Sequence, residues 1–331
     1  MESSNIVFTG KQQAELVREE APVLSDDGLL VRTKMTLIST GTESICFRGD
    51  TEAGTHWSSW VKYPFYPGYS NVGTVEQVGA AVEGYKEGDR VFSAAHHHQL
   101  HLVKPPAKKI PEYISNESAA WSKLATIAQT GVRRACLEMG DSVVVIGLGP
   151  LGQLVSQYAR VMGAEEILAI DLVKSRLDVA EAHSVTHSFE GSAADAGTFV
   201  ADQTDGRLAD VVFDATGHFS VFPLALKLVR RFGTMLLIGD SPHPGRQVLT
   251  SDILTRQITV KGTHNERLQD ERVWPTRRQV DLFYRYIERG QMRVEDLITS
   301  KNPPVEAQRV FADLQANRGA NIGVAFDWSD V

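Results

Sequence analysis

The stretch VVVIGLGPLG at residues 143–152 decides the fold of this chain. A β-branched apolar run ends at Gly147, a helical apolar pattern follows, and a second apolar strand ends on Asp171. This order predicts one strand–helix–strand unit. Gly147 would permit a tight turn, Gly149 would let the backbone approach a pyrophosphate, and Gly152 would let the helix pack closely on the strand. The helix N-terminus would then face the phosphates of a dinucleotide.

The acid that ends the second strand indicates which dinucleotide is bound. Asp171 is expected to accept hydrogen bonds from a ribose diol, and its charge would repel the 2′-phosphate of NADP. This favours NAD(H), although Lys174 and Arg176 follow closely enough to offset part of the repulsion. A glycine turn in an unrelated α/β domain is the alternative interpretation. The residues expected to bind the cofactor are Gly147, Gly149, Pro150, Leu151, Gly152, Asp171, Thr216 and Gly239.

Composition limits the possible functions. The chain has 331 residues, 42% of them hydrophobic and 23% charged, with a formal net charge of −7. Two domains are expected at this length. The chain has no surplus of basic residues, so nucleic acid binding is not indicated. No apolar run has the length of a membrane span and no secretory signal is evident, so we expect a cytoplasmic protein. Cys46 and Cys136 are the only cysteines, which excludes a four-cysteine zinc lobe.

The pattern of elements predicts a two-part architecture. Short strands with glycine turns precede residue 120, strands alternate with helices after Gly140, and two amphipathic helices and a last strand follow Gly262. Alternation of strands and helices implies a doubly wound parallel sheet in an α/β protein. We therefore expect a β-rich domain at 1–120, completed by 263–331, and a nucleotide-binding domain at 121–262.

Four motifs resemble one family. They are STGTE at 39–43, PGYSNVG at 67–73, GDRV at 88–91 and the glycine turn at 147–152. Together they resemble the medium-chain dehydrogenase/reductase superfamily, which includes alcohol dehydrogenases and quinone reductases. The resemblance implies a GroES-like β-barrel catalytic domain, a Rossmann domain and a nicotinamide site in the cleft between them. It also implies a homodimer or homotetramer paired through Rossmann sheet edges, with which the apolar strand at 258–260 is compatible.

The chain departs from the zinc-dependent members of this superfamily at their metal ligands. Where they place cysteine, histidine, glutamate and cysteine, this chain has Thr40, Tyr69, Ser70 and a position close to Thr126. Hydroxyl groups are poor zinc ligands, so no zinc is expected. The branch that the first two motifs resemble is that of bacteriochlorophyllide dehydrogenases and their relatives, which oxidise a secondary hydroxyethyl group with NAD.

The proton-transfer group is the open question in a metal-free enzyme. Tyr69 replaces a metal ligand, and a phenol with an ordinary pKa of about 10 needs a cationic neighbour to act near neutral pH. Lys123 is the candidate neighbour, or the base itself if it is desolvated. The alternative is that Tyr69 packs in the cleft wall and Lys123 reaches solvent. Glu43 and Thr42 are expected to bind substrate hydroxyls or to relay a proton, or else to hold a turn and a strand.

A histidine run and an aromatic stretch complete the candidate site. If residues 96–101 form a strand, the four histidines divide between its two faces, which argues against a metal site and leaves His97 as a substrate-binding or proton-moving residue. The aromatic segment between Phe47 and Tyr66 is expected to shape the substrate site or a subunit contact. Its candidate substrate residues are Trp57, Trp60 and Tyr63. A polar turn at 264–267 is a further candidate for cofactor contact.

These patterns lead to one principal hypothesis and two alternatives. The principal one is a zinc-independent, NAD-dependent dehydrogenase of secondary alcohols or polyols. An NADPH-dependent quinone or enoyl reductase keeps the fold and needs no zinc. A non-catalytic dinucleotide-binding sensor or structural protein is the alternative from another class. Small-molecule substrates are expected, with neither nucleic acid nor membrane as a partner.

Overall fold

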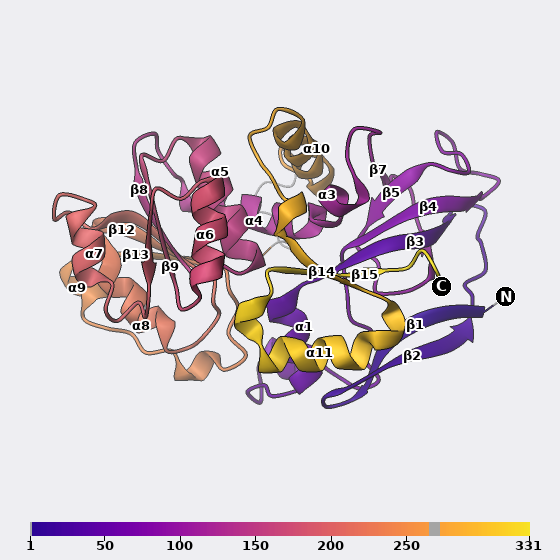
Figure 1. Cartoon of the computed structure of the whole chain (residues 1–331), viewed down its shortest axis with the longest axis horizontal. Helices are drawn as coiled ribbons and strands as arrows, with labels where there is room; N and C mark the ends of the chain where they lie inside the picture. Colours follow the sequence, from indigo (N-terminus) through magenta and orange to yellow (C-terminus); the bar gives the residue numbers. More distant parts are fainter. Residues whose placement is uncertain (1, 265–271) are drawn as a thin grey trace. The chain divides into compact units, whose positions relative to one another are not determined.

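The computed structural model describes residues 2–264 and 272–331, which form two compact units (Figure 1). The N-terminal unit comprises the chain up to Asp50, His56–Lys123 and Val294–Val331. The Rossmann unit comprises Thr51–Thr55 and Leu124–Arg293. None of the described helices is both long and apolar enough to cross a membrane.

The N-terminal unit is built around a seven-stranded sheet with the order β14-β15-β3-β4-β5-β7, in which β6 also pairs with β3. All of its pairs are antiparallel except β14 with β15. A separate antiparallel hairpin is formed by β1 and β2. The strands are β1 (Glu2–Gly10), β2 (Gln13–Glu20), β3 (Leu29–Ile38), β4 (Asn71–Val78), β5 (Arg90–Ser93), β6 (Leu100–Val103), β7 (Lys108–Lys109), β14 (Ile298–Asn302) and β15 (Gly323–Asp327).

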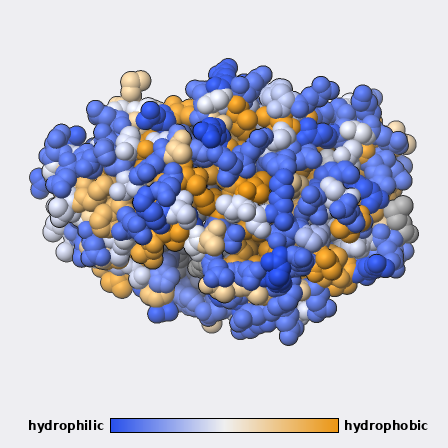
Figure 2. Space-filling view, viewed as in Figure 1, coloured by the Kyte–Doolittle hydropathy of each residue, from blue (hydrophilic) through white to orange (hydrophobic). Residues whose placement is uncertain are grey.

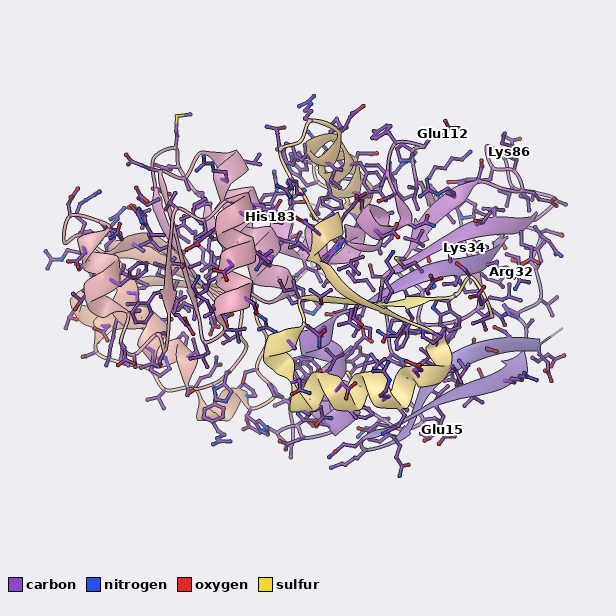
Figure 3. All side chains as sticks on the ribbon, viewed as in Figure 1. Glu15, Arg32, Lys34, Lys86, Glu112 and His183 are labelled. Carbon is purple, nitrogen blue, oxygen red and sulfur yellow. The ribbon has the colours of Figure 1, made fainter. Side chains whose placement is uncertain are left out.

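Strand β3 is buried along most of its length, and only two of its residues keep partial exposure. Thr33 and Met35 are buried, whereas Arg32 and Lys34, labelled in Figure 3, keep partial exposure. Arg32 forms an ion pair with Glu76 of β4, with 3.0 Å between Nε and Oε2. The middle of β3 therefore reaches the surface only through these two side chains.

Helices cover this sheet and close its core. They are α1 (Thr40–Arg48), α2 (His56–Trp60), α3 (Asn116–Ala120) and α11 (Ala307–Ala316). The expected amphipathic helix near residue 310 is confirmed by α11, which buries Ala307, Val310, Phe311 and Leu314. It runs beside the β1–β2 hairpin in Figure 1. Its Phe311 ring stands 4.7 Å from Phe8 in an edge-to-face contact.

The Rossmann unit contains a six-stranded sheet in the order β10-β9-β8-β11-β12-β13. Every pair is parallel, so the predicted doubly wound α/β fold is confirmed. The strands are β8 (Ser142–Ile146), β9 (Glu166–Asp171), β10 (His187–Glu190), β11 (Ala209–Asp214), β12 (Val229–Leu237) and β13 (Thr259–Gly262). The chain runs from β8 outward to β10 and then from β11 outward to β13. The order of strands therefore reverses between β8 and β11, where α/β sheets of this type bind ligands.

Seven helices accompany the described strands of this unit. They are α4 (Ser122–Ala135), α5 (Pro150–Met162), α6 (Lys174–His183), α7 (Gly197–Asp202), α8 (Val221–Ala225), α9 (Asp252–Thr255) and α10 (Thr276–Glu288). His183, labelled in Figure 3, ends α6, and its Nδ1 lies 3.3 Å from Gln157 Nε2 of α5. Hydrophilic residues cover most of the face shown in Figure 2, with apolar residues in smaller groups among them. The apolar strands β8 and β9 are buried along almost their whole length.

The unit boundaries differ from the predicted ones. The expected return to the first domain at residue 263 occurs only at Val294, because α10 belongs to the Rossmann unit. Buried Gln279 of α10 explains this, since its carbonyl oxygen accepts from Gln129 Nε2 at 3.3 Å and its Oε1 accepts from the Thr130 hydroxyl at 3.1 Å. Thr51–Thr55 also joins the Rossmann unit, where Glu52 N donates to the Pro242 carbonyl oxygen.

Candidate active site

A buried carboxylate stands where β3 gives way to α1. Glu43 lies in the first turn of α1, where an acid is favoured by the helix dipole, and reaches back to the residue before the helix. Its Oε1 accepts from Ser39 N at 2.8 Å, and its Oε2 lies 2.8 Å from His97 Nε2. The two side chains of this pair are only 2% and 1% exposed. A carboxylate only accepts, so His97 Nε2 carries the hydrogen.

His97 is held by its backbone and by the packing of its ring. Its backbone N donates to the Pro67 carbonyl oxygen at 3.0 Å, and its ring packs edge-on to Phe326 at 5.3 Å. Gly68 has φ +94°, and a Cβ there would be 2.8 Å from the His97 ring, so this position requires glycine. The Nδ1 atom is buried and has no hydrogen-bond partner among the described residues. The ring is therefore held by its bond to Glu43 and by its packing on Phe326.

Tyr69 joins the same cluster through its hydroxyl group. That group is hydrogen-bonded to the side chains of Ser39 and Thr42. Burial raises the pKa of Tyr69 far above its usual range, and the Glu43 carboxylate raises it further. Thr42, Glu43, Tyr69 and His97, which the sequence proposed as catalytic residues, are thus brought together in one polar cluster.

The direction of this pKa shift corrects one expectation. A cationic neighbour was expected to lower the pKa of Tyr69, but the groups around the phenol keep it protonated. Low dielectric and an adjacent negative charge both disfavour a phenolate, which is the physical reason. Lys123 is half-buried at the second residue of α4. Its proposed role stays a prediction.

The positions that hold zinc in related enzymes carry unsuitable donors. The Ser70 hydroxyl donates to the Ala120 carbonyl oxygen at 2.5 Å, and Thr126 is buried within α4. Burial raises the pKa of the Cys46 thiol, so a thiolate is disfavoured there as well. Within residues 2–264 and 272–331, no group of three or more His, Cys, Asp or Glu side chains is arranged to hold a metal ion. Hydroxyl donors that are already hydrogen-bonded do not fit a zinc site.

The histidine run does not form the strand that was expected. Only Leu100–Val103 is a strand, and His96, His97 and His98 lie in the connection before it. The Nδ1 atom of His96 lies 2.8 Å from the Gly68 carbonyl oxygen, and His101 Nε2 lies 3.0 Å from the Ser93 hydroxyl. Burial lowers the pKa of His98 to about 4 and that of His101 to about 3. Before the ladder of β6 with β3 begins at Leu100, this connection makes only isolated backbone bonds, including an Asn5–His98 bridge to β1. Its irregular course brings His97 alone of the four histidines to Glu43.

The aromatic segment has mainly packing contacts. Trp57 is 3% exposed and belongs to the apolar core of the N-terminal unit. The Tyr63 hydroxyl donates to the Cys46 carbonyl oxygen at 2.7 Å, which fixes the loop against α1. Trp60 is 48% exposed and is the one of the three with a largely accessible ring. Direct substrate contact therefore fits Trp60 better than the other two proposed residues, and all three roles stay predictions.

The glycine turn of the Rossmann unit has the features that a pyrophosphate needs. Gly147 has φ +89°, and a Cβ on Gly152 would stand 2.0 Å from the Gly147 carbonyl oxygen. A Cβ on Gly149 would meet only Arg176 Nη1, at 4.0 Å. Helix α5 begins at Pro150 without a side-chain cap, so no side chain occupies its N-terminus. An open backbone turn before an uncapped helix fits a bound phosphate group.

Asp171 is held next to this turn. Its Oδ2 accepts from Leu148 N at 2.6 Å, and its Oδ1 accepts from Val173 N at 2.9 Å. Arg176 Nη1 lies 3.9 Å from Oδ2, so the offsetting cation considered from sequence is present. Each carboxylate oxygen retains a lone pair for another donor. The carboxylate is therefore oriented to receive a ribose hydroxyl, and part of its charge is balanced by a guanidinium.

The second half of the Rossmann unit brings Thr216 and Gly239 to the same sheet edge. Thr216 N and its hydroxyl both donate to Asp214 Oδ1, at 2.9 and 2.6 Å. Gly239 N donates to the Asp214 carbonyl oxygen at 2.9 Å. Asp214 and Ser39 were not proposed as site residues from the sequence, although Asp214 lies two residues before Thr216 and Ser39 lies three residues before Thr42. Of the polar turn at 264–267, His264 is exposed, and residues 265–267 lie outside the described residues.

Comparison with known proteins agrees with both halves of this architecture. The alcohol dehydrogenase GroES-like domain matches residues 27–110, and the zinc-binding dehydrogenase domain matches residues 150–276. A relative named "Probable D-xylulose reductase A" from Aspergillus clavatus is 30% identical over 304 residues, covering 80% of this chain and 81% of its own. The chain belongs to the zinc-type alcohol dehydrogenase group of the medium-chain dehydrogenases/reductases.

Solved structures of the superfamily show the same fold. A protein from Sinorhizobium meliloti 1021, described as a zinc-binding dehydrogenase and bound to NADP, has a TM-score of 0.82, 20% identity and coverage of 99% of both chains. An alcohol dehydrogenase from Escherichia coli CFT073 in complex with NADH has a TM-score of 0.82 and 20% identity, with coverage of 98% of this chain and 99% of that chain. This medium-chain dehydrogenase is accordingly an oxidoreductase, as its family and relatives establish.

Proposed function

We propose that this medium-chain dehydrogenase interconverts a secondary alcohol and a ketone of a polyol or ketose, with NAD(H) and without zinc. The observation that carries the proposal is the hydrogen-bonded cluster of Ser39, Thr42, Glu43, Tyr69 and His97. Within it, Tyr69 takes the position of a metal ligand of the zinc-dependent members. The name of the Aspergillus relative supports the substrate class, since xylulose is a ketose.

The nicotinamide, when bound, supplies or accepts the hydride. The glycine turn at 147–152 would hold the pyrophosphate, and Asp171 would bind the adenosine ribose. Asp171 favours NAD(H) because a 2′-phosphate would meet its charge. The preference is moderated by Arg176 at 3.9 Å.

Tyr69 is the proposed proton donor. Its raised pKa keeps the phenol protonated near neutral pH, so it is ready to give a proton to the oxygen of a ketone as that oxygen gains negative charge. The hydrogen-bonded side chains of Ser39 and Thr42 would stabilise the phenolate left behind. The same pKa leaves Tyr69 in the protonated form near neutral pH, which is the form that ketone reduction requires.

Glu43 and His97 act behind Tyr69 as positioning residues. Glu43 accepts a hydrogen bond from the backbone N–H of Ser39, and the side chain of Ser39 is hydrogen-bonded to the Tyr69 phenol. His97 in turn holds the Glu43 carboxylate in place. Burying such a pair is costly unless its geometry is well satisfied. A protein that only binds a dinucleotide does not need a buried Glu43–His97 pair beside Tyr69. The free-energy cost of burying that pair therefore weighs against the sensor alternative.

An NADPH-dependent quinone or enoyl reductase is the second candidate. The guanidinium of Arg176 favours it, since a cation close to Asp171 would accept a 2′-phosphate. Protonated Tyr69 would serve there as well, because hydride addition to a conjugated carbon leaves an oxyanion to protonate.

Initial rates with a panel of ketoses, quinones and enones, each with NADH and NADPH, separate these candidates. Ketose reduction with NADH is the expected result. Turnover of quinones or enones with NADPH would replace the proposal by the second candidate, and no turnover of any pair despite cofactor binding would favour a binding protein.

We also propose an oligomeric state, on the basis of the same family membership. We expect a homodimer or homotetramer formed through β13, which is the edge strand of the Rossmann sheet and carries Val260 at 38% exposure. Sedimentation equilibrium would test this, and a monomer at micromolar concentration would contradict it.

A further inference from the structure

Asp214 is a buried carboxylate that the proposed chemistry does not use. It ends β11, is 0% exposed, and lies in register with Ile146 of β8 and Leu237 of β12. Strands β8 and β11 are the pair at which the strand order reverses. Ligands of doubly wound sheets bind at the carboxyl ends of such strands. Asp214 therefore lies directly beneath the expected dinucleotide site of the Rossmann unit.

The contacts of Asp214 tie together the turns that follow the central strands. Its Oδ1 receives the backbone N–H and the hydroxyl of Thr216, at 2.9 and 2.6 Å. Its carbonyl oxygen accepts from Ile238 N at 3.1 Å and from Gly239 N at 2.9 Å. The other carboxyl oxygen, Oδ2, is buried without a hydrogen-bond partner among the described residues. Converging donors on Oδ1 orient the turn at Thr216.

These turns are packed closely against one another. A Cβ on Gly147 would be 2.7 Å from Thr216 Cγ2, and a Cβ on Gly239 would be 2.3 Å from Gly217 N. Gly217 has φ +65° and faces the Asp240 carbonyl oxygen, with 2.6 Å to a Cβ built there. A displacement of Thr216 would therefore disturb both the turn at Gly147 and the turn at Gly239.

We propose that Asp214 is a positioning residue for the nicotinamide half of the dinucleotide, acting by holding the Thr216–Gly217 turn. This proposal rests on the dinucleotide binding proposed above. The turn at 147–152 and Asp171 belong to the first half of the sheet, which takes the adenosine half and the pyrophosphate, whereas β11 and β12 belong to the second half. Loss of Asp214 should consequently weaken contacts to the nicotinamide end and spare those to adenosine.

Titration of the protein with NADH and with ADP-ribose, which lacks the nicotinamide, separates these two halves. Asp214→Asn keeps an oxygen that can accept from Thr216 but replaces Oδ2 with an amide donor, which has no acceptor among the described residues. We expect the Kd for NADH to rise about tenfold or more, as a buried donor without an acceptor implies, with the Kd for ADP-ribose within about twofold of the wild type.

Thr216→Val is the second variant and keeps the test informative if Asp214→Asn folds poorly. It removes the hydroxyl donor and leaves the carboxylate, so a smaller change of the same pattern is expected. Equal loss of both ligands, or no change in either, would overturn the positioning role. Wild-type protein that binds neither ligand would instead refute the dinucleotide assignment itself, and this proposal with it.

Discussion

Substitution of Glu43 by Gln removes a single charge from the buried cluster and keeps its shape. The amide oxygen can still accept from Ser39 N, but the amide group then meets the N–H of His97, which needs an acceptor. Hydrogen bonds to a charged acceptor contribute about 1.5–3 kcal/mol, and a broken buried pair costs about 3–5 kcal/mol. Because Gln preserves one of the two bonds, we expect a loss of about 2–4 kcal/mol in the free energy of unfolding of the N-terminal unit.

The same substitution should change the acidity of Tyr69. The Glu43 carboxylate raises the pKa of this phenol, so removing the charge should lower that pKa. The alkaline limb of ketone reduction, on which a protonated phenol is required, should therefore move to lower pH. Stability loss and a shifted pH profile are independent readouts of one electrostatic contact.

Urea unfolding followed by tryptophan fluorescence, together with a pH–rate profile, measures both effects. Glu15→Gln is the matched control, because Glu15 lies on β2 in an exposed position (Figure 3) and accepts a surface hydrogen bond from the Thr9 hydroxyl. It should change stability by no more than about 0.5 kcal/mol. If Glu43→Gln behaves like this control in both measurements, the cluster is not the electrostatic unit described above.

Three further predictions address the glycine turn, the buried histidines and the ribose site. Gly152→Ala should abolish measurable NADH binding and lower the melting temperature, because its Cβ would stand 2.0 Å from the Gly147 carbonyl oxygen; Gly197→Ala, with no atom within 4 Å, should do neither. The contribution of His101 to stability should be constant above about pH 6.5 and fall as pH drops from there toward about 3. Burial lowers the pKa of His101 to about 3, so the unfolded chain alone takes up this proton in that window. Urea titrations of wild type and His101→Gln across this range should show a shallower slope in the variant, and equal slopes would refute the assignment. Asp171→Ser should shift the ratio of NADPH to NADH affinity at least tenfold toward NADPH, since Arg176 remains; fluorescence titrations that show an unchanged ratio would mean that Asp171 does not select the cofactor.

The Rossmann unit was predictable because local pattern and tertiary contact agree there. The run that ends at Gly147 is a strand because its β-branched residues are buried on both faces, and each glycine of the turn meets a specific steric demand. Such demands are short-range and therefore appear in the sequence at fixed spacing. The place of α10 was missed because it depends on a long-range contact between buried Gln279 and Gln129, which no local pattern reports.

The polar cluster was predictable as a set of residues but not in its electrostatics. Motif positions alone brought Thr42, Glu43 and Tyr69 together. The direction of the Tyr69 pKa shift depends on burial and on which charge lies nearest, and neither is encoded in spacing. The isolated approach of His97 to Glu43 arises from an irregular connection, whereas regular strand alternation would have placed His97 with His101.

Rates of ketose reduction by wild type and Tyr69→Phe, on chelator-treated protein of measured zinc content, test the central claim most directly. The claim is that the protonated Tyr69 phenol, and not a zinc ion, stabilises the developing charge on the ketone oxygen by donating a proton to it. We predict turnover at negligible zinc, and a loss of about 10²–10⁴ in kcat for Tyr69→Phe with NADH affinity unchanged, the range expected for a positioned proton donor. Wild-type turnover in Tyr69→Phe, or activity that tracks zinc content, would contradict it.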